Sequence, residues 1–297
     1  NIKNYFKRYY CPNNVAICMS GDFDPDKVIA TIDKYFGGWK ANPNLSRPEY
    51  APVPTLTAPT DTTVIGQEAE NVMLGWKFDR AASLQQDTLN VIAEMLSNGK
   101  AGLFDLNLDQ KMQYLGGAAF VYPLAEYSSL IVEGLPKEGQ TLEQVRDLML
   151  GEIEKLKRGE FSDDLLPSVI NNMKLDAYKE MEDNDSRASK FVDAFINGQE
   201  WSDVVGRLDR ISHITKQQIV DFANRHLLNN YVAVYKRQGV DSTVKKIDKP
   251  QITPIPSNRD KQSAYVAEIA NAKAEPIQPV FVDFKRDITF GKTKKGL

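Results

Sequence analysis

Alternating apolar and polar positions mark the strands of this chain. Within residues 71–78, Val72, Leu74 and Trp76 fall on one side of an extended backbone, which is the period-two pattern of a strand with one buried face. β-branched and aromatic composition favours a last strand over Tyr231–Tyr235. Besides these two, strands are predicted over residues 62–66, 116–122 and 129–135.

Helices are predicted where apolar residues recur at every third or fourth position. The stretches Thr141–Gln144 and Ser83–Gln86 have the spacing of capping boxes, which start a helix by pairing side chains with free backbone N–H groups. Asn98-Gly99 is a typical helix stop. The predicted helices cover residues 84–96, 103–112, 142–156, 162–178, 184–195, 202–211 and 215–227.

The order of these elements, β-β-α-α-β-β-α-α-α-α-α-β, predicts an α+β domain over residues 61–240. We expect one mostly antiparallel sheet with helices packed on one of its faces. Residues 41–60 hold five prolines and little periodicity, so a semi-rigid linker is predicted there. Residues 241–297 are predicted to be a linker or strap toward a missing second half, with one helix somewhere between residues 259 and 274 and a strand over 280–284.

Residues 1–40 predict a smaller α-β-α piece. A helix is followed by a turn at Pro12-Asn13-Asn14, a strand over Val15–Met19, and a second helix that Asp24 and Pro25 open. This piece is too small to bury its own apolar faces, because one strand needs neighbours to form a sheet. We therefore expect the C-terminal piece of an incomplete first domain, whose partner strands precede this sequence.

The composition is that of an ordinary soluble globular protein, with 297 residues, 42% hydrophobic, 26% charged and a net charge of −3. No nucleic-acid surface is expected, because Lys292, Lys294 and Lys295 form only a small basic tail. No run approaches the roughly 18 to 20 apolar residues that span a membrane. Cys11 and Cys18 lie at the start and end of the same short segment, and an extended backbone between them holds the thiols too far apart to bridge. They are interpreted as small buried hydrophobes rather than redox or metal groups.

Few residue patterns in this sequence are typical of a catalytic site. His213 and His226 are too far apart in sequence to form the i, i+4 ligand pair of a zinc-binding helix, so structural roles are expected. His226 lies in the last turn of its helix, where a cation complements the helix dipole. The stretch Asn98–Gly102 is only superficially similar to a phosphate-binding loop and is interpreted as a plain turn between helices. No Gly-x-Ser-x-Gly nucleophile elbow occurs.

Four acidic residues close together in sequence raise the alternative of a calcium site. Glu180, Glu182, Asp183 and Asp185 lack the glycine and the distal glutamate of a calcium loop. Asp183 and Asn184 are instead expected to end one helix and cap the next. Metal binding by this cluster is therefore not predicted.

Two further pairs of residues are assigned structural roles. Asp163 and Asp164 are predicted in the first turn of a helix, where carboxylates complement the dipole. Gly116-Gly117 permits close backbone approach and either lines a peptide groove or allows a tight start to a strand. The tight strand start is the favoured interpretation.

The first forty residues follow a recurrent order of features. A helix leads to a Tyr-x-Pro-x-Asn turn at Tyr10, Pro12 and Asn14, then a strand, then Gly21-Asp22, then a helix that ends at Tyr35-Phe36-Gly37. This order resembles a signature of the insulinase/pitrilysin family of zinc metallopeptidases, the inverzincins. The resemblance rests on many consecutive features in the same order rather than on any one strong motif.

The resemblance continues to about residue 240. Five further stretches are similar to the family pattern. They are a short strand, a helix that starts at an aspartate and carries later leucines, a small-residue turn before a leucine-rich helix, a later helix end, and a final helix-strand pair. The corresponding stretches are Val72–Phe78, Asp87–Leu96, Asn98–Phe104, Lys157–Leu165 and Ile219–Tyr235.

The resemblance implies a large α+β protein whose repeated homologous domains enclose a peptide-binding chamber. In such proteins the two histidines of H-x-x-E-H and a distal glutamate hold zinc, and the motif glutamate is the general base. This sequence contains no H-x-x-E-H. The resemblance therefore assigns no catalytic and no metal-binding residue here, leaves the substrate-binding residues unknown, and places zinc elsewhere in the whole protein.

The main hypothesis is a fragment of a zinc-dependent endopeptidase that supplies chamber wall and peptide-contacting surface, inactive and zinc-free by itself. The alternative is a non-catalytic homologue, either an inactive partner subunit or a structural module like a core protein; an unrelated α+β binding module is a third possibility. The expected partners are peptide substrates and either the remaining domains of the same chain or a homologous subunit. A bacterial, extracytoplasmic (periplasmic) setting is expected.

Overall fold

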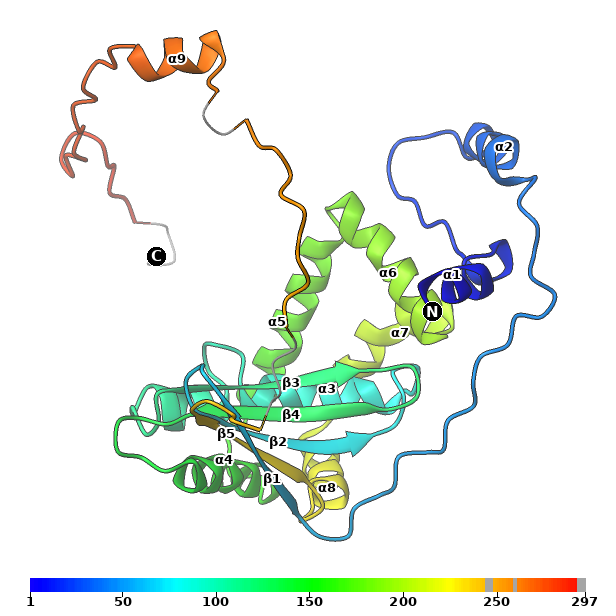
Figure 1. Ribbon diagram of the computed structural model, residues 1–297. Coiled ribbons are helices and arrows are strands. Elements are labelled where there is room, and N and C mark those ends of the chain that lie inside the picture. Colours follow the sequence, from blue (N-terminus) through cyan, green and yellow to red (C-terminus); the bar gives the residue numbers. More distant parts are fainter. Residues whose placement is uncertain (244–247, 259–260, 293–297) are drawn as a thin grey trace. The chain divides into compact units, whose positions relative to one another are not determined.

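The computed structural model describes residues 1–243, 248–258 and 261–292. The chain divides into two units, Asn1–Val244 and Lys245–Leu297. The first unit contains a sheet and the helices that pack on it (Figure 1). The four-part division of the chain expected from its sequence stays a prediction.

A five-stranded sheet forms the centre of the first unit (Figure 1). Its strand order is β1-β5-β2-β4-β3. β1 runs parallel to β5, and all other neighbours are antiparallel, so the predicted α+β class with a mostly antiparallel sheet is confirmed. The strands are β1 (Thr60–Gly66), β2 (Asn71–Phe78), β3 (Gly116–Pro123), β4 (Ser128–Leu135) and β5 (Val232–Gln238).

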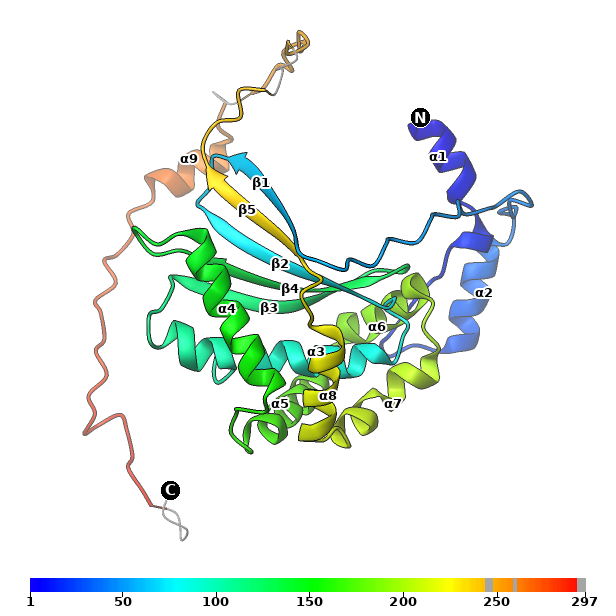
Figure 2. The same ribbon diagram turned by 90° about the horizontal axis from the view of Figure 1, so that it is seen from below.

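Helices cover one face of this sheet, as Figure 2 shows from that side. α3 packs against β3, α4 packs against β2 and β4, and α5 and α7 pack against α3. Every helix in the described ranges is too short or too polar to cross a bilayer. The helices are α3 (Gln85–Leu96), the short π-helical η2 (Asp105–Asp109), α4 (Leu142–Lys157), α5 (Leu165–Glu180), α6 (Asn184–Asn197), α7 (Trp201–Ser212) and α8 (Lys216–His226).

The covered face of the sheet supplies the core. Val72, Leu74 and Trp76 of β2 are at most 1% exposed, as their alternation predicts. They belong to the same apolar cluster as the inward side chains of α3 and α4, such as Ile92 and Met149. Each such side chain contributes about 1.5 to 3 kcal/mol when it leaves water. This burial holds α3 and α4 against the sheet.

An ion pair joins α3 to α7 at the edge of this core. Oδ2 of Asp87 accepts a hydrogen bond from Nε of Arg210 at 2.6 Å, and Nε of Arg207 lies 3.8 Å from Oδ1. Asp87 is buried, so it needs a charged partner in the folded state. The pair therefore fixes how α7 lies on α3.

One of the two predicted capping boxes forms. In Thr141–Gln144 the threonine hydroxyl accepts from the glutamine N–H at 3.1 Å, and the glutamine side chain accepts from the threonine N–H at 2.9 Å. In Ser83–Gln86 no such box forms, because the amide of Gln86 donates to the carbonyl of Asp79 and to the hydroxyl of Ser128 instead. A tertiary partner on β4 has replaced the local cap.

The N-terminal piece has its predicted helices but lacks its predicted strand. Asp24 caps the second helix by accepting from the N–H groups of Asp26 and Lys27 at 3.1 and 3.3 Å. Val15–Met19 forms no strand within the described residues, because no described residue pairs with it, and Ile17 is 50% exposed. Its expected pairing with strands of a first domain stays a prediction. A ladder needs a second strand, whatever the pattern of one. The elements are α1 (Ile2–Tyr9), η1 (Pro12–Asn14) and α2 (Pro25–Phe36).

The proline-rich stretch, the two cysteines and the basic tail can each be compared with their predictions. The proline-rich residues 41–59 form neither helix nor strand. Cys11 is buried as expected, whereas Cys18 is only partly buried, and both are free thiols. Of the small basic tail, Lys292 is exposed, and its other lysines lie outside the described residues.

The second unit has one helix in its described part, α9 (Ala264–Asn271), which Ser263 caps. It lies within the range 259–274 in which one helix is predicted; residues 259–260 of that range lie outside the described residues. The strand predicted over Val280–Phe284 is wrong. These residues form coil and the start of a turn, with their large apolar side chains exposed and no described strand beside them.

Replacing Gly134 with alanine is expected to destabilise the fold. A Cβ there would lie 2.5 Å from Cγ1 of Val145 and 3.0 Å from Sδ of Met149, both on α4. Val145 is fully buried and stiff at χ1, so overpacking should cost about 1 to 3 kcal/mol of unfolding free energy, measured by urea denaturation. Gly75→Ala is the matched control, because no described neighbour lies within 4 Å of a Cβ there. Equal losses in the two variants would contradict this packing.

Candidate functional site

The two histidines have separate structural environments. Nδ1 of His213 lies 2.9 Å from the carbonyl oxygen of Asp209 at the exposed end of α7. The ring of His226 lies against Phe78 and Phe222, with centroid distances of 5.8 and 4.5 Å. Burial is the main cause that lowers the pKa of His226 below its usual value, so the neutral ring is favoured rather than the cation expected at a helix end. The predicted structural roles agree with these contacts.

The acidic cluster near residue 183 serves a helix end and an ion pair. Oδ1 of Asp183 accepts from the N–H of Ser186 at 2.8 Å and caps α6, as predicted. Glu180 pairs with Lys190 at 2.6 Å. These contacts account for the two residues without any metal ion.

Asp163 and Asp164 do not lie in the first turn of a helix, so that prediction is wrong. α5 begins one residue later, at Leu165, and Asp164 occupies its cap position without a side-chain cap bond. Asp163 instead pairs with Lys216 at 2.8 Å. The ammonium group of Lys216 lowers the pKa of Asp163 below its usual value.

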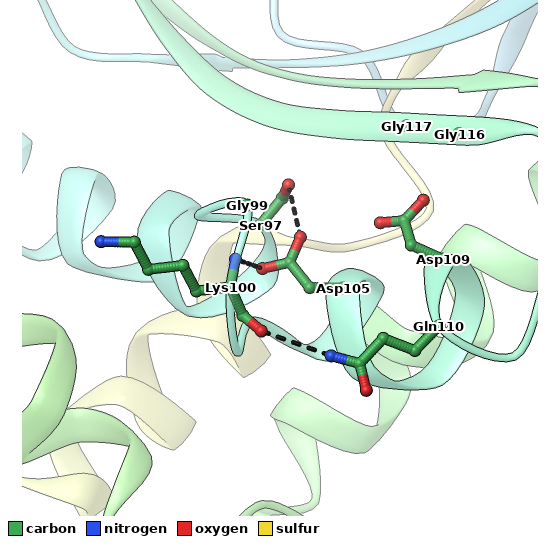
Figure 3. Close-up of a pocket in the computed structure, with 8 residues that line it drawn as sticks. All are labelled: Ser97, Gly99, Lys100, Asp105, Asp109, Gln110, Gly116 and Gly117. Atoms are coloured by element: carbon green, nitrogen blue, oxygen red, sulfur yellow. Dashed lines mark hydrogen bonds between the residues drawn. The ribbon is translucent and has the colours of Figure 1, made fainter. Parts of the chain in front are cut away.

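A carboxylate fills the loop Asn98–Gly102. Oδ2 of Asp105 accepts hydrogen bonds from three backbone N–H groups of this loop at 2.7 to 3.1 Å. Its Oδ1 accepts from the hydroxyl of Ser97 at 3.2 Å (Figure 3). The N–H groups that would have to cradle a phosphate are thus already used by the protein itself. The interpretation of this stretch as a turn between helices is confirmed.

This loop forms one wall of a pocket of about 370 Å³ that opens to solvent. The first wall consists of Gly99 and Lys100 of the loop and of Ser97 just before it. The second wall comes from η2 and Gln110, and the third is Gly116-Gly117 at the start of β3 (Figure 3). Three stretches of chain therefore meet at this point.

Asp109 carries no ion pair within the described residues and points toward the start of β3, whereas the Lys100 side chain points away (Figure 3). Burial, and then the nearby Asp105, raise the pKa of Asp109, and the Tyr114 hydroxyl partly offsets this. Tyr114 is 2% exposed. Its hydroxyl makes no hydrogen bond of good geometry in the described part of the chain, and burial with the Asp109 carboxylate raises its pKa.

β3 is an open edge of the sheet. It pairs with β4 along its length, and no described strand lies on its other side. An edge strand presents unpaired N–H and C=O groups outward. A Cβ on Gly117 would lie 2.5 Å from the hydroxyl of Tyr114 and 2.6 Å from the carbonyl of Glu133. The tight strand start favoured from the sequence is therefore confirmed, and the same glycine lines the pocket.

Sequence reasoning missed Asp109 and Tyr114. Asp109 looks like an ordinary helical carboxylate, and Tyr114 looks like a core aromatic. The i, i+4 spacing of Asp105 and Asp109 is the one local signal that both carboxylates belong to one helical face. The rest of the pocket depends on β3 passing over η2, which no local pattern predicts.

Comparison with known proteins identifies the family. Residues 1–173 match a family model described as the peptidase M16 inactive domain. The chain belongs to the peptidase M16 family. The zinc protease PqqE of Helicobacter pylori is 26% identical over 227 residues, which are 70% of this chain and 47% of that protein. The resemblance to the insulinase/pitrilysin metallopeptidases is thus confirmed, and this M16 chain spans about half the length of its curated relative.

Solved structures share the fold of the M16 chain. A protease from Helicobacter pylori gives a TM-score of 0.75 at 21% identity and covers 80% of this chain and 58% of its own. The peptidase M16 inactive domain from Pseudomonas fluorescens gives 0.62 at 12% identity, covering 74% and 53%. The periplasmic protease PqqL from Escherichia coli gives 0.59 at 16% identity, covering 80% and 28%.

Zinc is the metal that the relative's name implies, and the residues described here do not fit it. No group of three His, Cys, Asp or Glu side chains in the described ranges is arranged to hold a metal ion. His213 and His226 have the partners given above, and the sequence has no H-x-x-E-H. No catalytic step through zinc can be assigned to these residues.

Acidification is expected to destabilise the M16 chain through His226. Its folded-state pKa lies below 6.5, so the unfolded state binds more protons, and stability present above that pH is lost as the pH falls below it. His226→Phe keeps a packed ring but cannot titrate. Its unfolding free energy, measured by urea denaturation, should fall less than wild type between about pH 7.5 and about pH 5.

The exposed His213 provides the control, because His213→Gln should keep the full pH dependence of the wild-type chain. A wild-type pH dependence in His226→Phe would show that His226 does not carry the effect.

Proposed function

We propose that this chain is the non-catalytic part of a zinc-dependent endopeptidase and supplies chamber wall and peptide-contacting surface. The observation that carries the proposal is the open edge of β3 beside a pocket. An exposed strand edge binds an extended peptide through main-chain hydrogen bonds, while neighbouring pockets select side chains. The zinc protease PqqE among the relatives supports the class of activity.

β3 suits this role better than β1, the other edge of the sheet. The pocket lies at the start of β3, so main-chain pairing and side-chain selection are available at the same place. Farther along the strand, Phe120 and Tyr122 are exposed and offer apolar contact to a neighbouring peptide. Because only an extended chain can pair along an edge, the proposed ligand is an unfolded or short peptide.

The proposal places zinc and catalysis in another part of the whole protein. Residues 1–40 would complete a first peptidase-like domain, 41–60 link it to the domain over 61–240, and 241–297 lead toward a second half. The partners would be the remaining domains of the same protein or a homologous subunit, together with peptide substrates. The periplasmic relative PqqL supports an extracytoplasmic, bacterial setting.

A second candidate is a non-catalytic homologue, such as an inactive partner subunit or a core-protein-like module. The description of the matching family model as an inactive domain favours it. In this case the edge of β3 would present peptides to, or pack against, a separate catalytic subunit. The two candidates differ in whether the whole protein carries its own zinc.

We expect this chain by itself to bind less than stoichiometric zinc, and the whole protein to bind zinc stoichiometrically. The physical reason is the lack of a fitting ligand set in the described residues. Atomic emission analysis after dialysis against zinc measures both. Stoichiometric zinc in the isolated chain would refute the placement of the metal, and a zinc-free whole protein would favour the second candidate.

Peptide pairing along β3 is tested with a labelled, N-acetylated peptide as long as the strand, 8 residues, built from alternating Thr and Val with one central arginine. Two further versions carry N-methyl groups on odd or on even residues. Alternate N–H groups of an extended chain point to the same side, so only one methylated version should lose binding in fluorescence anisotropy. Equal binding of both methylated versions would argue against pairing at the edge.

A further inference from the structure

The pocket between the Asn98–Gly102 loop, η2 and the start of β3 holds a carboxylate without an ion-pair partner in the described residues. We propose that this pocket binds the basic side chain, above all an arginine, of a peptide that lies along β3, with Asp109 as the selecting residue. The inference rests on the proposed function and adds to it the class of peptide recognised.

The two carboxylates of the pocket have different roles. Asp105 accepts four hydrogen bonds from the loop and from Ser97, so its charge is already compensated. Asp109 has no comparable set of donors, and the Lys100 side chain points away from it (Figure 3). A half-buried carboxylate with spare acceptor capacity favours a cation and repels a phosphate or a carboxylate.

The position of the pocket suits a side chain of a peptide paired with β3. Successive side chains of an extended peptide point to opposite faces of a sheet, so every second one points toward the face that α3 and η2 cover. Gly116-Gly117 lines the pocket and has no side chain to fill it. A long peptide side chain at this level can therefore pass the strand and reach Asp109.

Tyr114 lies next to this carboxylate, with its side chain buried beside the start of β3. The side chain is 2% exposed, and its hydroxyl makes no well-formed hydrogen bond with any described residue. It lies beside Gly117 and close enough to Asp109 that each affects the other. Buried polar groups are normally paired, and Asp109 is the carboxylate beside this hydroxyl. A guanidinium has five N–H donors in one plane, enough to engage both oxygens of Asp109 at once, which a lysine ammonium matches less well.

Matched peptides test this pocket on the whole 297-residue chain. The first is the acetylated Thr/Val peptide with its central arginine; the second has citrulline there, which keeps the shape and removes the charge. Fluorescence anisotropy should show that wild type binds the arginine peptide roughly tenfold more tightly. Asp109→Asn should abolish this preference. Glu126→Gln, an exposed charge in the β3–β4 turn, should retain it and controls for long-range attraction.

The outcomes separate this inference from the proposed function. Equal affinity for the arginine and citrulline peptides on the wild-type chain, or a preference that survives Asp109→Asn, overturns the inference. If one N-methylated version still loses binding in that case, pairing along β3 stands and only the pocket is refuted. If both methylated versions bind equally, the proposed function fails instead. Circular dichroism melting of each variant checks the fold, and the wild-type comparison decides the matter even if a variant does not fold.

Discussion

The structure depends on burying one face of a twisted sheet under α3 and α4. Val72, Leu74 and Trp76 on β2 belong to the same core as the inward residues of both helices. Gly134 on β4 lets α4 approach the sheet, because a Cβ there would collide with Val145. The helices cover a face of the sheet and do not pair with its edges. β3 is the last strand in the order, so its outer edge has no strand partner within the described residues.

Polar residues that follow α3 lie beside the open edge of β3 and line the pocket there. Two carboxylates one helical turn apart take opposite roles there. Asp105 satisfies the N–H groups of the loop that follows α3 and so shapes a wall of the pocket. Asp109 keeps its acceptor capacity and points toward the start of β3. Asp105 thus stabilises a wall of the pocket, and the carboxylate of Asp109 lines the same pocket.

Membership of the peptidase M16 family and the lack of a zinc-fitting ligand set in the described residues are compatible with a division of labour. In such an arrangement one part of a protein cleaves and another holds and selects the peptide. An edge strand suits the second task because main-chain pairing accepts many sequences, while an adjoining pocket restricts them. The M16 chain has both features on one scaffold, and neither requires a metal.

The sequence by itself determined the elements that local periodicity and local capping specify. The alternation of Val72, Leu74 and Trp76, the capping box Thr141–Gln144 and the order of strands and helices all report local periodicity, which backbone geometry converts directly into structure. Only the tertiary structure decided the rest. The apolar stretches Val15–Met19 and Val280–Phe284 form no ladder, because a strand needs a neighbour that its own sequence cannot specify. The pocket at Asp109 likewise exists only where three separate stretches of chain meet.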